Sequence, residues 1–217
     1  MNILAKVGTY RRIFDVSIER LFENALDWEH LPHLHGKSFK AIDLIAADRS
    51  GWRANVTLED GQELVLDLRI GASGWVTRTE ASGTLLSEIK TVAEAIGPDR
   101  CRVSVSFHAT PSGAGKAAVV GAAYALLYAE LYDEDERMMI ARAEAKRRPA
   151  AEWRATRDVT LADGRSFSVP QYCPHQGLPL DGDPDAEGIM TCPWHGYRFD
   201  VATGRCVSGQ ASGWRRR

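Results

Sequence analysis

Apolar and polar residues alternate along three segments in the first half of the chain. Apolar side chains occupy every second position in residues 52–58, 64–70 and 101–107. A period of two predicts β-strands that bury one face. Between the first two segments, Asp60 and Gly61 predict a hairpin turn. The pattern therefore predicts an antiparallel meander.

The pattern changes after residue 115. Residues 116–148 are rich in Ala, Leu, Glu and Arg and contain no proline before Pro149, which predicts one or two long helices. We expect a short helical opening ahead of the strands, so that the first part of the chain consists of a helical segment, a curved sheet and a closing helix. The polar stretch 144–152 contains Pro149 and predicts a linker.

The second part of the chain carries turn signals instead of long periodic segments. Residues 160–165 and 200–205 each contain a glycine among polar residues and predict a β-hairpin. We therefore predict a domain of residues 1–148, followed by a small all-β domain of residues 149–217. The predicted fold class is α+β.

Composition limits the possible partners. The chain has 217 residues, 44% of them hydrophobic, which is enough for real cores, and its net charge of -2 argues against binding to nucleic acid or a membrane surface. The longest nearly unbroken apolar run, residues 117–129, is too short to span a bilayer. The N-terminal residues do not have the pattern of a secretory signal, so we expect a cytoplasmic protein.

Two short loops near the C-terminus carry the strongest chemical signal. Residues 173–177 read Cys-Pro-His-Gln-Gly and residues 192–196 read Cys-Pro-Trp-His-Gly. Each loop offers one thiolate and one imidazole, which is the ligand set of a [2Fe-2S] cluster with two sulfurs on one iron and two nitrogens on the other. A structural zinc site is the alternative, but zinc fingers group Cys with Cys and His with His. The prolines and glycines predict tight turns that bring backbone N–H groups close to the sulfurs.

Residues 173–180 and 192–200 resemble the cluster loops of the Rieske non-haem iron oxygenase family. The resemblance implies a Rieske [2Fe-2S] cluster and the ligands on each of its irons: Cys173 and Cys192 on one, His175 and His195 on the other. Neither loop has the extra cysteine that forms a disulfide in the Rieske proteins of quinol-oxidising complexes. This favours the branches that receive electrons from an NAD(P)H-dependent reductase or a ferredoxin. The predicted order of the first domain also resembles the helix-grip fold of START-like domains, which underlies the catalytic domain of these oxygenases.

A second metal centre is predicted in residues 23–35, where three histidines and three acids gather. A mononuclear iron requires two imidazoles and one carboxylate on one side. Asp27, His30 and His35 match the family's spacing of Asp, two residues, His, four residues, His. The resemblance implies that the two histidines bind iron and that Asp27 relays electrons from a neighbouring subunit's cluster. In a straight helix His30 and His35 would lie about 140° apart, so we expect Pro32 to bend the chain.

The third iron ligand is expected from the later helix. Residues 131–139 resemble the segment that carries the family's carboxylate ligand, and we assign Asp135, with Asp133 as the alternative. His33 could replace one of the other histidines, because it lies three residues from His30. The rival interpretation has no iron here, since START-like domains without metal carry a similar Leu-Pro run and the acids could form a solvated turn.

The resemblance implies a terminal oxygenase that uses Fe(II) and O2 to hydroxylate or demethylate a small hydrophobic or aromatic substrate. It also implies a homotrimer, because the family joins one subunit's cluster to the next subunit's iron. Small residues of the long helix could line the substrate cavity or could serve plain helix packing: Gly121, Ala122, Ala125 and Leu126. The alternative function is an electron-transfer protein whose START-like domain binds a hydrophobic ligand without metal.

Overall fold

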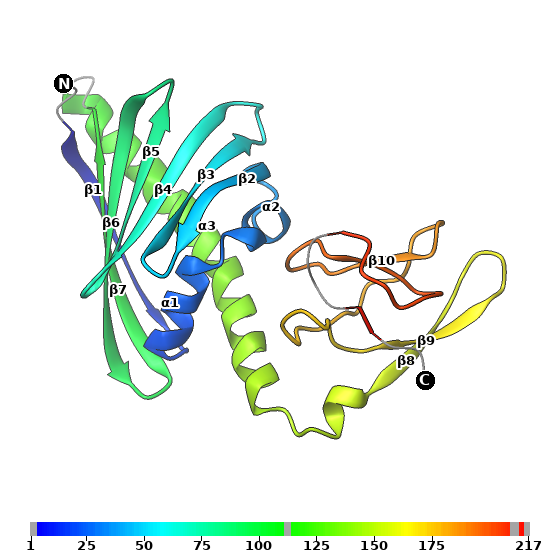
Figure 1. The fold of residues 1–217 in the computed structure, drawn as a ribbon. Helices are drawn as coiled ribbons and strands as arrows, with labels where there is room; N and C mark the ends of the chain where they lie inside the picture. The colour runs from blue at the N-terminus through cyan, green and yellow to red at the C-terminus, as the bar shows by residue number, and fades with distance from the viewer. Residues whose placement is uncertain (1–3, 111–113, 209–212, 215–217) are drawn as a thin grey trace. The chain divides into compact units, whose positions relative to one another are not determined.

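The computed structural model describes residues 4–110, 114–208 and 213–214, and the chain divides into two compact units, Met1–Met139 and Ile140–Arg217 (Figure 1). The helices and strands that begin in the first unit are β1 (Ala5–Phe14), α1 (Ile18–Leu26), the 3-10 helix η1 (Trp28–His30), α2 (Leu31–Leu34), β2 (Phe39–Asp48), β3 (Gly51–Leu58), β4 (Glu63–Gly71), β5 (Gly74–Ala81), β6 (Thr84–Gly97), β7 (Arg100–Ala109) and α3 (Ala114–Arg147). Those of the second unit are the 3-10 helix η2 (Glu152–Arg154), β8 (Thr156–Thr160), β9 (Ser166–Pro170), β10 (Ile189–Thr191) and β11 (Arg198–Asp200).

The first unit is an antiparallel sheet with the strand order β1-β7-β6-β5-β4-β3-β2. The three segments predicted from alternation are β3, β4 and β7. The predicted turn between β3 and β4 is also confirmed: Gly61 has φ +86° and its N–H donates to the Leu58 carbonyl oxygen at 2.9 Å. The predicted α+β class, with a long closing helix after the sheet, is confirmed.

The predicted helical opening is wrong in one respect, because strand β1 precedes the helices. It pairs with β7 from Ala5 to Phe14 and forms one edge of the sheet. In β1 the polar residues do not all lie on the exposed face of the strand. Ile13 is exposed, whereas Arg12 is half-buried and forms ion pairs with two acids of α3. An inward arginine beside an outward isoleucine removes the alternation by which a strand is recognised.

Helices α1 and α2 connect opposite edges of the sheet. Because β1 lies at one edge and β2 at the other, the chain between them has to cross the sheet, and Figure 1 shows both helices beside its end. Ser17 caps α1 by accepting a hydrogen bond from the Arg20 N–H, at 3.4 Å. Trp52 of β3 donates its indole N–H to the Ala25 carbonyl oxygen at 2.9 Å, which holds the end of α1 against the sheet.

Helix α3 packs on the sheet through a glycine contact. A Cβ atom on Gly121 would lie 2.1 Å from the carbonyl oxygen of Val7, and one on Gly8 would lie 2.9 Å from the Gly121 Cα. The helix therefore touches the backbone of β1. Of the two alternatives for Gly121, Ala122, Ala125 and Leu126, the lining of a cavity is wrong, because none of them lines the cavity described below and Leu126 is 70% exposed. Helix packing, the other alternative, describes Gly121. Small residues occur all around this helix, so their positions do not indicate its inward face.

We expect Gly121→Ala to destabilise the protein by about 1–3 kcal/mol, because the added methyl group overlaps backbone that cannot rotate away. Urea unfolding of the full chain measures the change. Gly115→Ala, in the same helix with open space around the glycine, is the matched control and should stabilise by about 0.5–1 kcal/mol. Equal effects of the two substitutions would contradict the close contact.

The second unit is built from two hairpins, β8-β9 and β10-β11. The hairpin predicted at residues 160–165 is confirmed: it joins β8 to β9, and the Gly164 N–H donates to the Leu161 carbonyl oxygen at 2.9 Å. At residues 200–205 the structure has a turn after β11, in which the Gly204 N–H donates to the Asp200 carbonyl oxygen at 2.7 Å. An isolated bridge between Phe199 and Cys206 closes this turn in place of a second strand. The core of the unit contains the following buried apolar side chains: Val159, Val169, Leu180, Met190, Phe199 and Val201. The predicted linker is shorter than expected, since α3 continues to Arg147.

The predicted division of the chain into domains, between residues 148 and 149, stays a prediction.

Within the described residues, no helix is long and apolar enough to cross a lipid bilayer.

Candidate metal centres

The two cysteine-histidine loops of the second unit have the same backbone structure. In the first loop the Gly177 N–H donates to the Cys173 carbonyl oxygen at 2.8 Å, and the Cys173 N–H donates to that of Leu178 at 2.8 Å. Gly177 has φ +73°, a conformation that favours glycine. The second loop repeats both bonds and the positive φ at the matching positions, Cys192, Gly196 and Tyr197.

The two sulfur atoms are buried and surrounded by donors. Two backbone N–H groups reach each sulfur, those two and three residues after the cysteine. The thiols also share a hydrogen bond, which lowers the pKa of Cys192 to about 4 and raises that of Cys173. One of the two sulfurs therefore ionises readily, and the thiolate is the form that binds a metal.

The two imidazoles of these loops lie together as well. The ring centroids of His175 and His195 are 4.9 Å apart with the planes at 86°, and the His175 ring also packs on Tyr197 at 4.4 Å. Two thiols and two imidazoles thus converge from two loops of equal shape. This donor set fits a [2Fe-2S] cluster with unlike irons, with Cys173 and Cys192 as sulfur ligands.

A stack of side chains supports the first cluster loop, and the sequence analysis did not identify it. Arg148 donates to the Gly177 carbonyl oxygen at 2.9 Å, and its guanidinium lies 3.4 Å from the ring centroid of Tyr172. The Trp153 ring occupies the space where a Cβ of Gly177 would lie, at 2.1 Å. Gly177 is therefore required by its conformation and by this contact.

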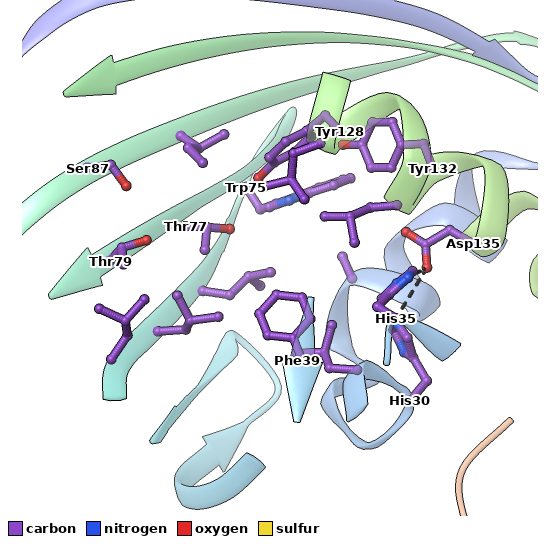
Figure 2. A pocket seen from close by; sticks show the side chains of 18 of the residues that line it. His30, His35, Phe39, Trp75, Thr77, Thr79, Ser87, Tyr128, Tyr132 and Asp135 are labelled. Carbon is purple, nitrogen blue, oxygen red and sulfur yellow. Dashed lines mark hydrogen bonds and ion pairs between the residues drawn. The ribbon is translucent and has the colours of Figure 1, made fainter. Parts of the chain in front are cut away.

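The second centre is formed by three buried side chains of the first unit (Figure 2). His30 ends η1, His35 follows α2, and Asp135 lies in α3. The nearest oxygen of Asp135 is 3.3 Å from His30 Nε2 and 3.1 Å from His35 Nε2. One ligand atom from each residue lies within 4.8 Å of the others. The structure therefore brings together the two histidines and the carboxylate that were expected to bind iron.

The histidines converge for a reason other than the expected bend at Pro32. Helix α1 ends at Leu26, and a new turn begins at Trp28. Pro32 occupies the first turn of α2, where proline is tolerated because its N–H would have no partner in the helix. No long helix exists for it to kink. Three short elements in sequence, rather than one bent helix, place His30 and His35 on the same side.

The alternative residues lie elsewhere. His33 is exposed and is not part of the cluster. The side chain of Asp133 is 68% exposed and forms an ion pair with Arg12. Asp27 lies between α1 and η1 and lines the same cavity as His30.

The interactions among the three side chains shift the pKa values of Asp135 and His35. Burial alone would raise the pKa of Asp135, but the hydrogen bonds with His30 and His35 outweigh it and hold the pKa well below its usual range. Burial alone would lower the pKa of His35, but Asp135 and then Glu134 outweigh it and raise the pKa. Asp135 is thus deprotonated, as a carboxyl group that binds a metal must be.

The donor set fits a mononuclear Fe(II). Two imidazoles and one carboxylate on one side of a metal form the facial arrangement that leaves positions open for other ligands. The Nδ1 atom of His35 contacts the carboxylate of Glu134 at 2.7 Å, which leaves its Nε2 facing the centre. Almost every metal-bound histidine donates its other ring N–H to such a partner, which is a carboxylate, a backbone carbonyl or a water. Sequence reasoning missed Glu134, although it lies directly beside Asp135.

We expect Glu134→Ala to weaken Fe(II) binding at this centre by about 10- to 100-fold, because His35 loses the partner that orients its ring. Titration of iron-free chain with Fe(II) under anaerobic conditions measures the affinity. Glu130→Ala is the matched control: Glu130 is an exposed glutamate one turn earlier in α3. An unchanged affinity in Glu134→Ala would remove its orienting role.

A cavity of about 390 Å³ adjoins this centre and lies between the sheet and the helices. Apolar side chains make up most of its wall, among them Leu21, Phe39, Trp52, Leu64, Leu66, Leu68, Trp75, Ile89, Leu127 and Leu131. His30, His35 and Asp135 line one end of it (Figure 2). The cavity is therefore suited to a hydrophobic small molecule placed beside the three side chains.

Comparisons with known protein sequences find similarity in the C-terminal part of the chain. Residues 129–213 match the sequence model of the family described as Rieske [2Fe-2S] domain. The cholesterol 7-desaturase nvd of Hemicentrotus pulcherrimus is 39% identical over 46 residues, which are 21% of this chain and 10% of that protein. The chain thus spans about a tenth of the length of the curated relative that it matches.

Solved structures resemble part of the chain at low sequence identity. A START superfamily protein from Mycobacterium smegmatis is 17% identical, with a TM-score of 0.49. The aligned part is 60% of this chain and 97% of the Mycobacterium protein. Norcoclaurine synthase from Thalictrum flavum is 14% identical, with a TM-score of 0.47. The aligned part is 64% of this chain and 87% of the synthase. The Zhui aromatase/cyclase from Streptomyces sp. R1128 is 8% identical, with a TM-score of 0.48. The aligned part is 68% of this chain and 98% of the aromatase/cyclase.

Proposed function

We propose that this chain, an iron-sulfur redox protein with a Rieske [2Fe-2S] domain in its C-terminal part, is a terminal oxygenase that oxidises a hydrophobic organic substrate with O2. One observation carries the proposal. His30, His35 and Asp135 form a buried group of two imidazoles and one carboxylate at the end of an apolar cavity. A redox domain alone would need neither the cavity nor these ligands.

The two metal groups have different tasks in this proposal. When bound, the [2Fe-2S] cluster supplies electrons one at a time, and the mononuclear Fe(II) supplies the site where O2 is activated. Cys173, Cys192, His175 and His195 hold the cluster. His30, His35 and Asp135 hold the single iron. An NAD(P)H-dependent reductase or a ferredoxin is the proposed electron donor.

The residues around the cavity have supporting tasks. Its apolar wall binds the substrate by excluding water, and it places part of the substrate beside the two histidines. Glu134 orients His35 through their hydrogen bond. We assign the electron relay to Asp27 and propose a homotrimer, in which a neighbouring subunit supplies the cluster.

The substrate class follows from the cavity. The name of the curated relative assigns cholesterol to that protein, and the match covers only 46 residues. The large share of leucine and aromatic side chains in the wall favours a small hydrophobic or aromatic compound.

Metal analysis after anaerobic reconstitution tests the proposal. We expect about three irons and about two acid-labile sulfides per chain, the additional iron belonging to the second centre. Chemically reduced protein should then consume O2 in a single turnover when a hydrophobic compound is present. About two irons per chain and no O2 consumption would favour the alternative, an electron-transfer protein whose cavity binds a ligand without metal.

A further inference from the structure

Three hydroxyl groups interrupt the apolar wall of the cavity at the end far from the iron ligands. Thr77 and Thr79 lie on β5, and Ser87 lies on the neighbouring strand β6. Thr79 and Ser87 are direct partners in the antiparallel pair. Figure 2 shows the three side chains together on one wall, with Asp135 at the opposite end. Three hydroxyls thus gather where the sheet would otherwise present only apolar side chains.

Ser87 is the informative member of this hydroxyl group. The residue is 1% exposed, and its Oγ has no hydrogen-bond partner within the part of the chain that the structure describes. A buried hydroxyl without a partner destabilises a folded protein, and an alanine at this position would avoid that cost. Because Ser87 also lines the cavity, a bound molecule can supply the missing partner.

The surroundings define the group that such a molecule presents. Among the described residues, no lysine or arginine lines the cavity, and its charged carboxyl groups belong to Asp27 and Asp135. A carboxylate or phosphate held by the three hydroxyls, at the end far from His30 and His35, would therefore be buried without a lysine or arginine beside it, which is strongly unfavourable. A neutral oxygen, which can accept from or donate to a hydroxyl, fits this wall.

We propose that Ser87, together with Thr77 and Thr79, binds the neutral oxygen of an elongated and otherwise apolar ligand, an alcohol or a ketone. The oxygen lies against β5 and β6, and the apolar remainder extends through the cavity toward His30, His35 and Asp135. The binding site is independent of iron. Only the identification of the far end as the part that is oxidised rests on the proposed function.

A matched ligand pair tests the proposal with the full chain. The probes are 4-cyclohexylcyclohexanol and bicyclohexyl, which differ by one hydroxyl group. Trp52 and Trp75 line the cavity, so tryptophan fluorescence reports binding, and calorimetry checks the affinities. The quantity to compare is the ratio of the two affinities, because it removes effects that both ligands share.

We expect Ser87→Ala to lower the ratio of alcohol to hydrocarbon affinity by about tenfold, since one hydrogen bond to a buried group is lost. Thr79→Val, which replaces the neighbouring hydroxyl with a methyl group, should lower the same ratio. The control is Ser106→Ala, which makes the same change on β7 at a residue that does not line the cavity. Its ratio should equal that of the unchanged chain.

Two results would overturn the site. One is an unchanged ratio of alcohol to hydrocarbon affinity in Ser87→Ala, whether both affinities stay the same or both fall equally. The other is a clear loss of thermal stability in ligand-free Ser87→Ala, which would show that the hydroxyl already has a structural partner. The iron content is measured separately: a chain that lacks the additional iron but keeps the alcohol preference loses only the oxygenase proposal, and the reverse result removes only this site.

Discussion

Asp135→Asn is expected to remove the mononuclear iron while the [2Fe-2S] cluster remains. Asp135 is the anionic member of the centre, and its Oδ1 lies 3.1 Å from His35 Nε2 and 3.3 Å from His30 Nε2. A neutral amide is a much weaker ligand for Fe(II) than a carboxylate. The loss of affinity should exceed about 100-fold, which is the effect that an outer partner of a metal ligand can already have.

Iron and sulfide analysis of the purified variant measures this result. We expect about two irons and about two sulfides per chain in Asp135→Asn, with an unchanged visible spectrum of the cluster. Asp133→Asn is the matched control, because it makes the same chemical change two residues earlier in α3, at an exposed side chain paired with Arg12. Iron lost from the Asp133 variant and kept in the Asp135 variant would exchange the roles of the two acids.

Cys192→Ala is expected to yield a colourless protein without acid-labile sulfide. The thiol of Cys192 is buried, receives backbone N–H groups and a hydrogen bond from Cys173, and has its pKa lowered to about 4. Removing it leaves the cluster with three protein ligands and leaves Cys173 without its partner. A [2Fe-2S] cluster requires the full set of four.

The chain contains a suitable control for this substitution. Cys206 belongs to the same unit and is half-buried, but it lies outside both loops, and its thiol donates to the Ser208 carbonyl oxygen. Cys206→Ala should keep the colour and the sulfide. Cluster assembly should be measured after anaerobic reconstitution of both variants, and a coloured Cys192→Ala protein with normal sulfide would exclude Cys192 as a ligand.

The cluster site could be predicted because its ligands are local in sequence. Each loop brings one cysteine and one histidine within three positions, and the hydrogen bonds that shape it stay within six residues. Proline and glycine determine such a turn with little help from the rest of the fold. The supporting stack of Arg148 on Tyr172 could not be predicted, because it joins residues that no short motif connects.

The mononuclear centre was predictable as a set of residue types and not as a geometry. His35 and Asp135 are 100 positions apart, and they meet only because α3 packs on the sheet. The bend expected at Pro32 would bring His30 and His35 together within one helix. The chain instead uses a short 3-10 helix and a separate turn, which spacing rules for a regular helix do not describe.

By itself the sequence determined the strands with regular alternation, the hairpin turns, the long helix and the cluster loops, since each depends on neighbours within a few residues. The tertiary structure alone decided which face of α3 turns inward, that β1 joins the edge beside β7, and that Ser87 faces a cavity. These features depend on packing between segments that are distant in sequence. Close contacts such as that of Gly121 with Val7 select one arrangement among several that the local pattern allows.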